Sequence, residues 1–133
     1  MIAELQQVVA KYAHALDELD VPGLEAVLTE DTTWTFAAPG QGVLGPVAGR
    51  PAVLGFVRDG HAAQTGRVRH HLGNVVVTAA DGDSALVQAT LLQTRDNQVI
   101  STGVYTLGLR QDGGVWRIAE LTLALDKPLE PIP

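Results

Sequence analysis

The chain has 133 residues, of which 46% are apolar and 18% charged, as expected for one compact domain that needs neither disulfide bonds nor a structural metal. It contains no cysteine, which excludes a disulfide framework, a thiolate zinc site and a cysteine nucleophile. Nine Lys and Arg against fifteen Asp and Glu give a formal net charge of −6, which disfavours nucleic acid or an anionic membrane surface as a partner.

The first predicted element is an amphipathic helix over residues 2–19, because apolar residues recur there at spacings of three and four. Pro22-Gly23 interrupts this pattern, and the apolar residues within 24–28 predict a short second helix that ends at the turn 29–31. Polar and aromatic residues then alternate over 33–36, which predicts a half-buried strand.

Residues 37–49 are rich in glycine and proline and are predicted to form a long loop. The spacing of its glycines matches a dinucleotide-binding motif, but Pro46 follows where that motif needs a helix to begin, so the match is discounted. Pro51 suits the first turn of a third helix, which continues toward His61.

The second half of the chain predicts an antiparallel meander. Its strand-like runs are separated by turn signals and span residues 72–79, 85–94, 99–109 and 115–125. Helices followed by hairpins predict an α+β fold with the helices on one face of a curved sheet. We expect a single domain over 1–126 and an extended, proline-rich tail over 127–133.

Six short motifs follow one another along nearly the whole chain: YAHALDELD at 12–20, LTED at 28–31, GRPAV at 49–53, HHLGNVVV at 70–77, GVY at 103–105 and DGGVWRI at 112–118. In this order and spacing they resemble the nuclear transport factor two-like (NTF2-like) superfamily, and within it the SnoaL-like and scytalone dehydratase-like branch. The resemblance implies a cone-like barrel, in which a strongly curved mixed or antiparallel sheet wraps around N-terminal helices and encloses an apolar pocket. Members include dehydratases, ketosteroid isomerases, polyketide cyclases and epoxide hydrolases, as well as proteins that only bind or associate.

Asp17 borders the apolar stripe of the first helix, where a carboxylate can face a pocket mouth. In the dehydratase-like pattern the matching position is an Asp that orients a catalytic His or shares a proton with it. A carboxylate that only caps the turn at Pro22 is the alternative interpretation.

The same pattern places a catalytic His at His70, or at His71 if the alignment slips by one residue. Neighbouring residues of a strand point to opposite faces, so only one of the two is expected to face inward. An imidazole oriented by a carboxylate can act as general acid or base on an enolisable or dehydrating substrate.

The chain departs from the family patterns at two places. The dehydratase pattern has a second catalytic His in the penultimate strand, where residues 99–102 hold none and only the hydroxyl of Ser101 or Thr102 can substitute. In the isomerase branch, the position of Tyr12 supplies a hydrogen bond to an enolate oxygen, but Phe36 stands where that branch has its carboxylate base. Glu120, on the last predicted strand, is a further candidate carboxylate whose facing is ambiguous.

The candidate ligand-binding residues are bulky side chains or neighbours of the proposed pair: Tyr12, Leu16, Trp34, Phe36, Phe56, His71, Leu72 and Tyr105. Such a lining favours a small apolar or aromatic ligand, of polyketide, terpenoid or steroid type. No cofactor is expected, and no metal, because the histidines lack the spacing of a metal site.

Two interpretations follow for the function. The first is a cofactor-independent enzyme of the dehydratase, cyclase or isomerase type, with Asp17 and His70 as its acid–base pair. The second is a non-catalytic ligand-binding or association domain of the same fold. By resemblance we expect a homo-oligomer, a dimer or a trimer. A cytoplasmic location is expected, because the sequence shows no secretion signal and no stretch near the roughly 18 apolar residues of a membrane span.

Overall fold

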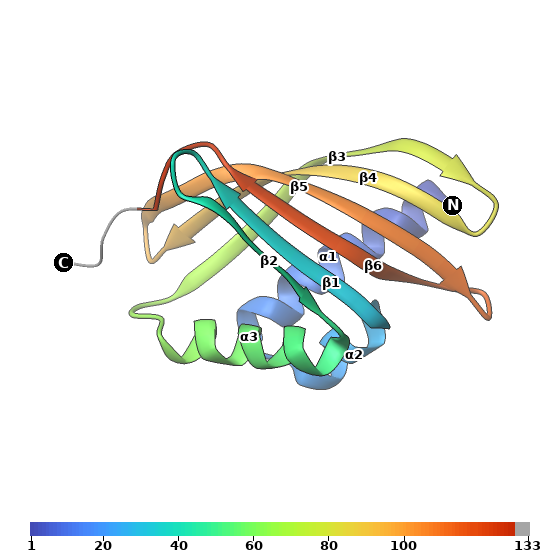
Figure 1. The fold of residues 1–133 in the computed structure, drawn as a ribbon, viewed down its shortest axis with the longest axis horizontal. Coiled ribbons are helices and arrows are strands. Elements are labelled where there is room, and N and C mark those ends of the chain that lie inside the picture. The colour runs from blue at the N-terminus through green and yellow to red at the C-terminus, as the bar shows by residue number, and fades with distance from the viewer. Residues whose placement is uncertain (130–133) are drawn as a thin grey trace.

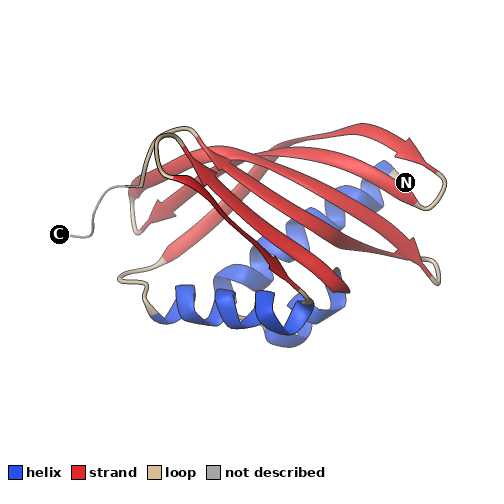
Figure 2. Cartoon of the chain, in the orientation of Figure 1, coloured by secondary structure: helices blue, strands red, loops and turns tan. Residues whose placement is uncertain are grey.

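The computed structural model describes residues 1–129, which form helices on one face of a mixed, open sheet (Figures 1 and 2). The helices are α1 (Ile2–Glu18), α2 (Val21–Val27) and α3 (Arg50–Ala62). The strands are β1 (Leu28–Ala38), β2 (Gly42–Ala48), β3 (Val68–Asp81), β4 (Ser84–Arg95), β5 (Gln98–Asp112) and β6 (Val115–Leu125). The predicted α+β class is confirmed, although the sheet does not close into a barrel.

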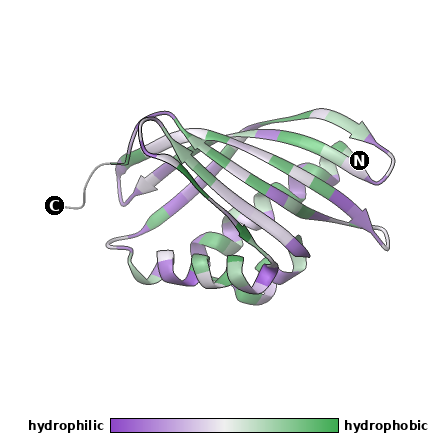
Figure 3. Ribbon diagram, in the orientation of Figure 1, coloured by the Kyte–Doolittle hydropathy of each residue, from purple (hydrophilic) through white to green (hydrophobic). Residues whose placement is uncertain are grey.

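The sheet has the strand order β2-β1-β6-β5-β4-β3. Strands β3 to β6 form the predicted antiparallel meander, and β1 joins it in parallel to β6. On β4 the inward residues Ala85, Val87, Ala89 and Leu91 are buried and alternate with exposed ones. Figure 3 colours the hydropathy of these strands along the ribbon. This period of two places one face of the sheet against the helices.

Helix α1 buries its predicted apolar stripe against the sheet, with Leu5, Val9 and Tyr12 almost fully enclosed. It ends at Leu19, which adopts a left-handed conformation with φ of 49°. Asp20 then caps α2, because its carboxylate accepts a hydrogen bond from the backbone N–H of Gly23 at 3.1 Å. No helix within residues 1–129 has the length and apolarity needed to cross a membrane.

Two predictions about the region after α2 are wrong. The predicted turn at 29–31 is already part of β1, which begins at Leu28 directly after the helix. The predicted loop over 37–49 is a hairpin of β1 and β2, in which Ala38 pairs with Gly42. Strand β2 lies at the edge of the sheet and is exposed at most positions, so it shows no burial alternation that a sequence pattern could reveal.

The tail contacts this hairpin. The side chain of Gln41 donates a hydrogen bond to the backbone oxygen of Leu129 at 3.0 Å and accepts one from its N–H at 2.9 Å. Residues 130–133 of the predicted tail lie outside the described residues.

Candidate active site between helix α1 and strand β3

Strand β3 is the other edge of the sheet, and helix α1 packs alongside it. The helix contributes Asp17 from its last turn, and the strand contributes His70 near its beginning. The strand starts four residues earlier than predicted, at Val68, so both His70 and His71 lie within it. The fold therefore joins two residues that are 53 positions apart in sequence.

Asp17 and His70 are in direct contact. The Nδ1 atom of His70 lies 2.7 Å from Oδ1 of Asp17. The backbone N–H of His70 also donates to Oδ1 and Oδ2 of the same carboxylate, at 2.9 and 3.2 Å. Because a carboxylate only accepts hydrogen bonds, the neutral imidazole in this geometry carries its proton on Nδ1 and its lone pair on Nε2.

Both side chains are shielded from solvent, with 7% of Asp17 and 12% of His70 exposed. Three hydrogen bonds fix the carboxylate, and the carboxylate fixes the plane of the ring. The imidazole is thus held in one tautomer and one orientation, as a general base requires.

Asp17 does not cap the turn at Pro22, which was the alternative interpretation of its position. That role belongs to Asp20, whose carboxylate binds the N–H of Gly23. Two carboxylates at the end of α1 therefore have separate partners, one in the neighbouring helix and one on the sheet.

His71 points away from the pair, as strand alternation predicts. It is exposed, and its Nε2 lies 3.2 Å from the hydroxyl of Thr94 on β4. Of the two adjacent histidines, only His70 contacts Asp17.

A cavity of about 320 Å³ borders the pair, lined by Ala10, Ala13, His14, Asp17, Arg69, His70, His71, Leu72 and Gly73. Five of its nine lining residues have ionisable side chains, whereas the resemblance implies an apolar pocket. Neither His14 nor Arg69 is among the site residues predicted from the sequence. A signal for His14 exists, since it precedes Asp17 by three residues and so lies one helical turn away on the same side of α1. Arg69 has no comparable signal beyond its position next to His70.

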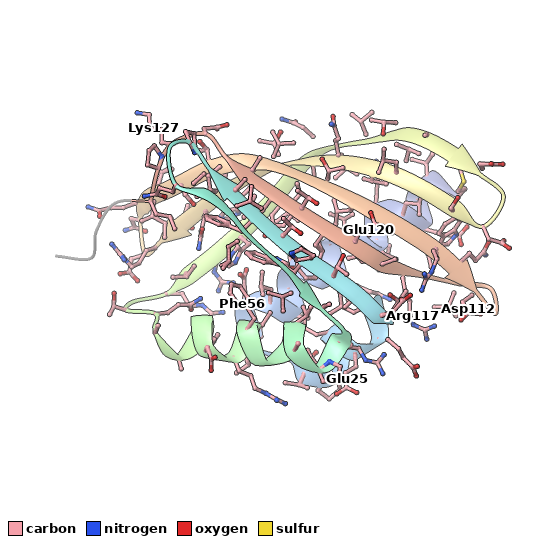
Figure 4. The ribbon with its side chains drawn as sticks, in the orientation of Figure 1. Glu25, Phe56, Asp112, Arg117, Glu120 and Lys127 are labelled. Atoms are coloured by element: carbon pink, nitrogen blue, oxygen red, sulfur yellow. The ribbon has the colours of Figure 1, made fainter. Side chains whose placement is uncertain are left out.

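Of the eight predicted ligand-binding residues, His71 and Leu72 line this cavity and six lie elsewhere. Tyr12, Trp34 and Tyr105 are buried in the core, and Leu16, Phe36 and Phe56 pack against it. Trp34 contacts two of these aromatic residues. Its ring stacks on that of Phe36, with 5.8 Å between the ring centroids. The ring centroid of Phe56, which extends from α3 toward the sheet, lies 4.5 Å from that of Trp34 (Figure 4).

The two tyrosines form an edge-to-face pair with ring centroids 6.3 Å apart. Burial raises the pKa of Tyr12 to about 12, although hydrogen bonding with Tyr105 and Trp34 acts in the opposite direction. Burial also raises the pKa of Tyr105 well above its usual value, and Tyr12 and Asp17 add to the effect. Both phenols therefore remain protonated over the whole range in which a histidine titrates.

The residues considered as substitutes for the missing second His have other partners. The hydroxyl of Ser101 donates to Oε1 of Gln93 at 2.8 Å, and that of Thr102 donates to Oδ2 of Asp126 at 2.7 Å. Glu120 is exposed on β6 (Figure 4).

The sequence of the chain matches that of a known protein family. A sequence model described as the SnoaL-like domain matches residues 1–122. Among curated proteins, a sequence comparison finds no match.

Solved structures share the fold over nearly the whole chain. A protein of unknown function with a cystatin-like fold from Nostoc punctiforme has a TM-score of 0.81 at 16% identity, with 96% of this chain and 92% of that one covered. A protein from Novosphingobium aromaticivorans with the provisional name aromatic ring hydroxylase is 28% identical, with a TM-score of 0.77 and coverage of 96% and 90%. Another protein from Novosphingobium aromaticivorans, provisionally named scytalone dehydratase, is 20% identical, with a TM-score of 0.77 and coverage of 99% and 89%.

Proposed function

Because the chain belongs to the SnoaL-like family of the NTF2-like superfamily, we propose that it is a cofactor-independent enzyme whose general base is His70. The observation that carries this proposal is the contact of 2.7 Å between His70 Nδ1 and Asp17 Oδ1 beside a cavity. The substrate is a small cyclic compound with a carbonyl or hydroxyl group, and the reaction is of the dehydratase, cyclase or isomerase type.

The chemistry begins with proton abstraction. The Nε2 lone pair of His70 takes a proton from a carbon next to a carbonyl, the C–H bond breaks, and its electron pair moves through the new C=C bond onto the carbonyl oxygen. The imidazolium that forms is stabilised by the Asp17 carboxylate, which already holds Nδ1–H. Elimination, cyclisation or isomerisation can each proceed from the resulting enolate.

Hydrogen–deuterium exchange at the α-carbon of 2-tetralone tests the first step without knowledge of the natural substrate. This ketone is a bicyclic compound with readily enolised protons, and its exchange in D2O is followed by NMR. The chain should accelerate exchange, and His70→Gln and Asp17→Asn should reduce the acceleration at least tenfold, since general base catalysis contributes about 10²- to 10⁴-fold. His61→Gln, on α3 outside the cavity lining, is the matched control and should exchange as the wild type does.

The alternative is a ligand-binding or association domain, and one contact favours it. Asp17 accepts the backbone N–H of His70 on an edge strand, so the carboxylate also has a purely structural use. Under this alternative, all four proteins in the exchange experiment give the same rate as buffer. The enzyme proposal requires instead that the wild type and His61→Gln accelerate exchange at least tenfold more than His70→Gln and Asp17→Asn do.

A further inference from the structure

Gln93 and Ser101 lie level with His70 on the inner face of the sheet. His70 on β3 pairs with Gln93 on β4, and Gln93 pairs with Ser101 on β5. All three are half-buried and follow the inward positions of their strands. Directly paired residues of neighbouring strands have Cβ atoms about 4.5–5.5 Å apart, so the three side chains form one polar row.

Ser101 fixes the orientation of the Gln93 side chain. Its hydroxyl donates a hydrogen bond to Oε1 of the amide at 2.8 Å. The amide oxygen is thereby occupied, and the two N–H groups of Nε2 are the part of the side chain that can bind something else. Ser101 thus makes the outer end of Gln93 a hydrogen-bond donor.

We propose that Gln93, oriented by Ser101, donates a hydrogen bond to the carbonyl oxygen of the substrate while His70 removes the adjacent proton. This inference rests on the proposed function and narrows it to carbonyl compounds. The negative charge that moves onto oxygen as the C–H bond breaks is stabilised by a donor already in place, as in an oxyanion hole. Gln93 is then a catalytic residue, and Ser101 is a positioning residue that acts through it.

The chemistry of the row favours a carbonyl oxygen over a departing hydroxyl group. Loss of water needs an acid that gives up a proton to the leaving oxygen. In this row only the imidazolium of His70 can do so, because neither the amide of Gln93 nor the hydroxyl of Ser101 is acidic near neutral pH. A neutral amide is suited to an enolate oxygen, which needs a hydrogen bond. In the next inward row, Leu91 and Gly103 are buried in the core, and Leu72 lines the cavity, where it offers an apolar contact for the carbon ring of such a substrate.

Binding of 2-naphthol, which resembles the enol of 2-tetralone, tests the donor separately from catalysis. Calorimetric titration of the full chain should show that Gln93→Leu weakens 2-naphthol binding about tenfold, the effect of one well-placed hydrogen bond in a shielded site. Gln88→Leu changes the same residue type on the exposed, outer side of β4 and should leave the affinity unchanged. Equal affinity of the wild type and Gln93→Leu, or no binding by the wild type, would overturn the inference.

The exchange of 2-tetralone separates this inference from the proposed function. If His70→Gln abolishes exchange but Gln93→Leu retains the wild-type rate, His70 is the base and our assignment of Gln93 is wrong. We expect Gln93→Leu to lower kcat by at least tenfold. Ser101→Ala should lower kcat less, and Ser101→Thr, which keeps the hydroxyl, should restore it. Failure of the threonine variant to restore the rate would exclude the positioning role of Ser101.

Discussion

Asp17 binds two different groups of a single residue, the ring and the backbone N–H of His70. The contact to the ring serves chemistry, because it sets the tautomer. The contact to the backbone serves stability, because an edge strand has N–H groups without a partner strand and Asp17 satisfies one of them beneath α1. Substitution of Asp17 therefore changes both properties, and the two must be separated by the choice of side chain.

Asp17→Ala should destabilise the fold by about 2 kcal/mol, because it leaves two donors of His70 without an acceptor in a shielded place. Asp17→Asn should cost about half as much, since its amide oxygen still accepts the backbone N–H. Urea denaturation measures both values. If the two variants are equally stable, the backbone contact contributes nothing and only the ring contact matters.

The raised pKa values of Tyr12 and Tyr105 predict that the free energy of unfolding depends on pH in the alkaline range. The pKa of Tyr12 is raised to about 12 in the folded chain against 10.0 for an exposed tyrosine. A raised pKa favours the protonated, folded form, so this contribution is complete below pH 10 and is lost as the pH rises toward 12. Ultraviolet titration should show no tyrosinate near pH 10 in the native chain, whose only tyrosines are Tyr12 and Tyr105, but ionisation there in urea. A native transition near pH 10 would contradict the burial of both phenols.

The sequence predicts Asp17 and His70 because each lies in a short motif at a recognisable place in its element. It does not predict Gln93 or Arg69 as parts of the site. The position of Gln93 beside His70 depends on strand register, and the place of Arg69 in the cavity lining depends on how α1 packs along β3. Both are long-range properties that no local pattern encodes. The same limit applies to the aromatic residues predicted to bind a ligand. A bulky residue at an inward position can belong either to the core or to a pocket wall, and the sequence pattern is the same for both.

At the level of elements, the carboxylates at the end of α1 have distinct tasks. Asp20 caps α2, and its partner is the N–H of Gly23 rather than any residue of the site. Asp20→Ala should therefore destabilise the fold by about 1 kcal/mol through loss of the cap. The exchange of 2-tetralone should be unchanged in this variant, measured beside thermal unfolding. If Asp20→Ala lowers the exchange rate as much as Asp17→Asn does, the separate roles assigned to Asp17 and Asp20 are wrong.

The long helices and the meander are predictable because their apolar periods extend over many residues, as the 17-residue α1 illustrates. The hairpin of β1 and β2 is missed for a physical reason. Its second strand, GVLGPVA, is exposed on both faces, so the chain can place glycine and proline there without loss of core packing. The composition of this segment therefore resembles that of a loop, and it becomes a strand through its pairing with β1 between Thr33 and Ala38.

The whole molecule is an open sheet whose two edges differ. The β3 edge is covered by α1 and carries the candidate site, while the β2 edge carries Pro46, which lacks the N–H that a further strand would need. The outer face of the sheet is not covered by any described helix, and exposed apolar side chains lie on its middle strands. These are Leu86, Leu92 and Val104, exposed by 41, 38 and 40%.

This outer face is where we expect copies of the chain to meet, given the homo-oligomer that the family resemblance implies. On this face Leu92 of β4 pairs with Thr102 of β5, and Thr90 of β4 pairs with Val104 of β5. Leu92 and Val104 therefore lie diagonally across two adjacent residue pairs of the same face. A lysine on this face would place a charge that requires solvation within an apolar contact.

Val104→Lys should therefore lower the mass measured by light scattering to that of a single chain. Val43→Lys, at an exposed position of β2, should leave the assembly intact. A wild-type chain that remains monomeric at high concentration would exclude this use of the face and leave its apolar side chains as isolated surface residues.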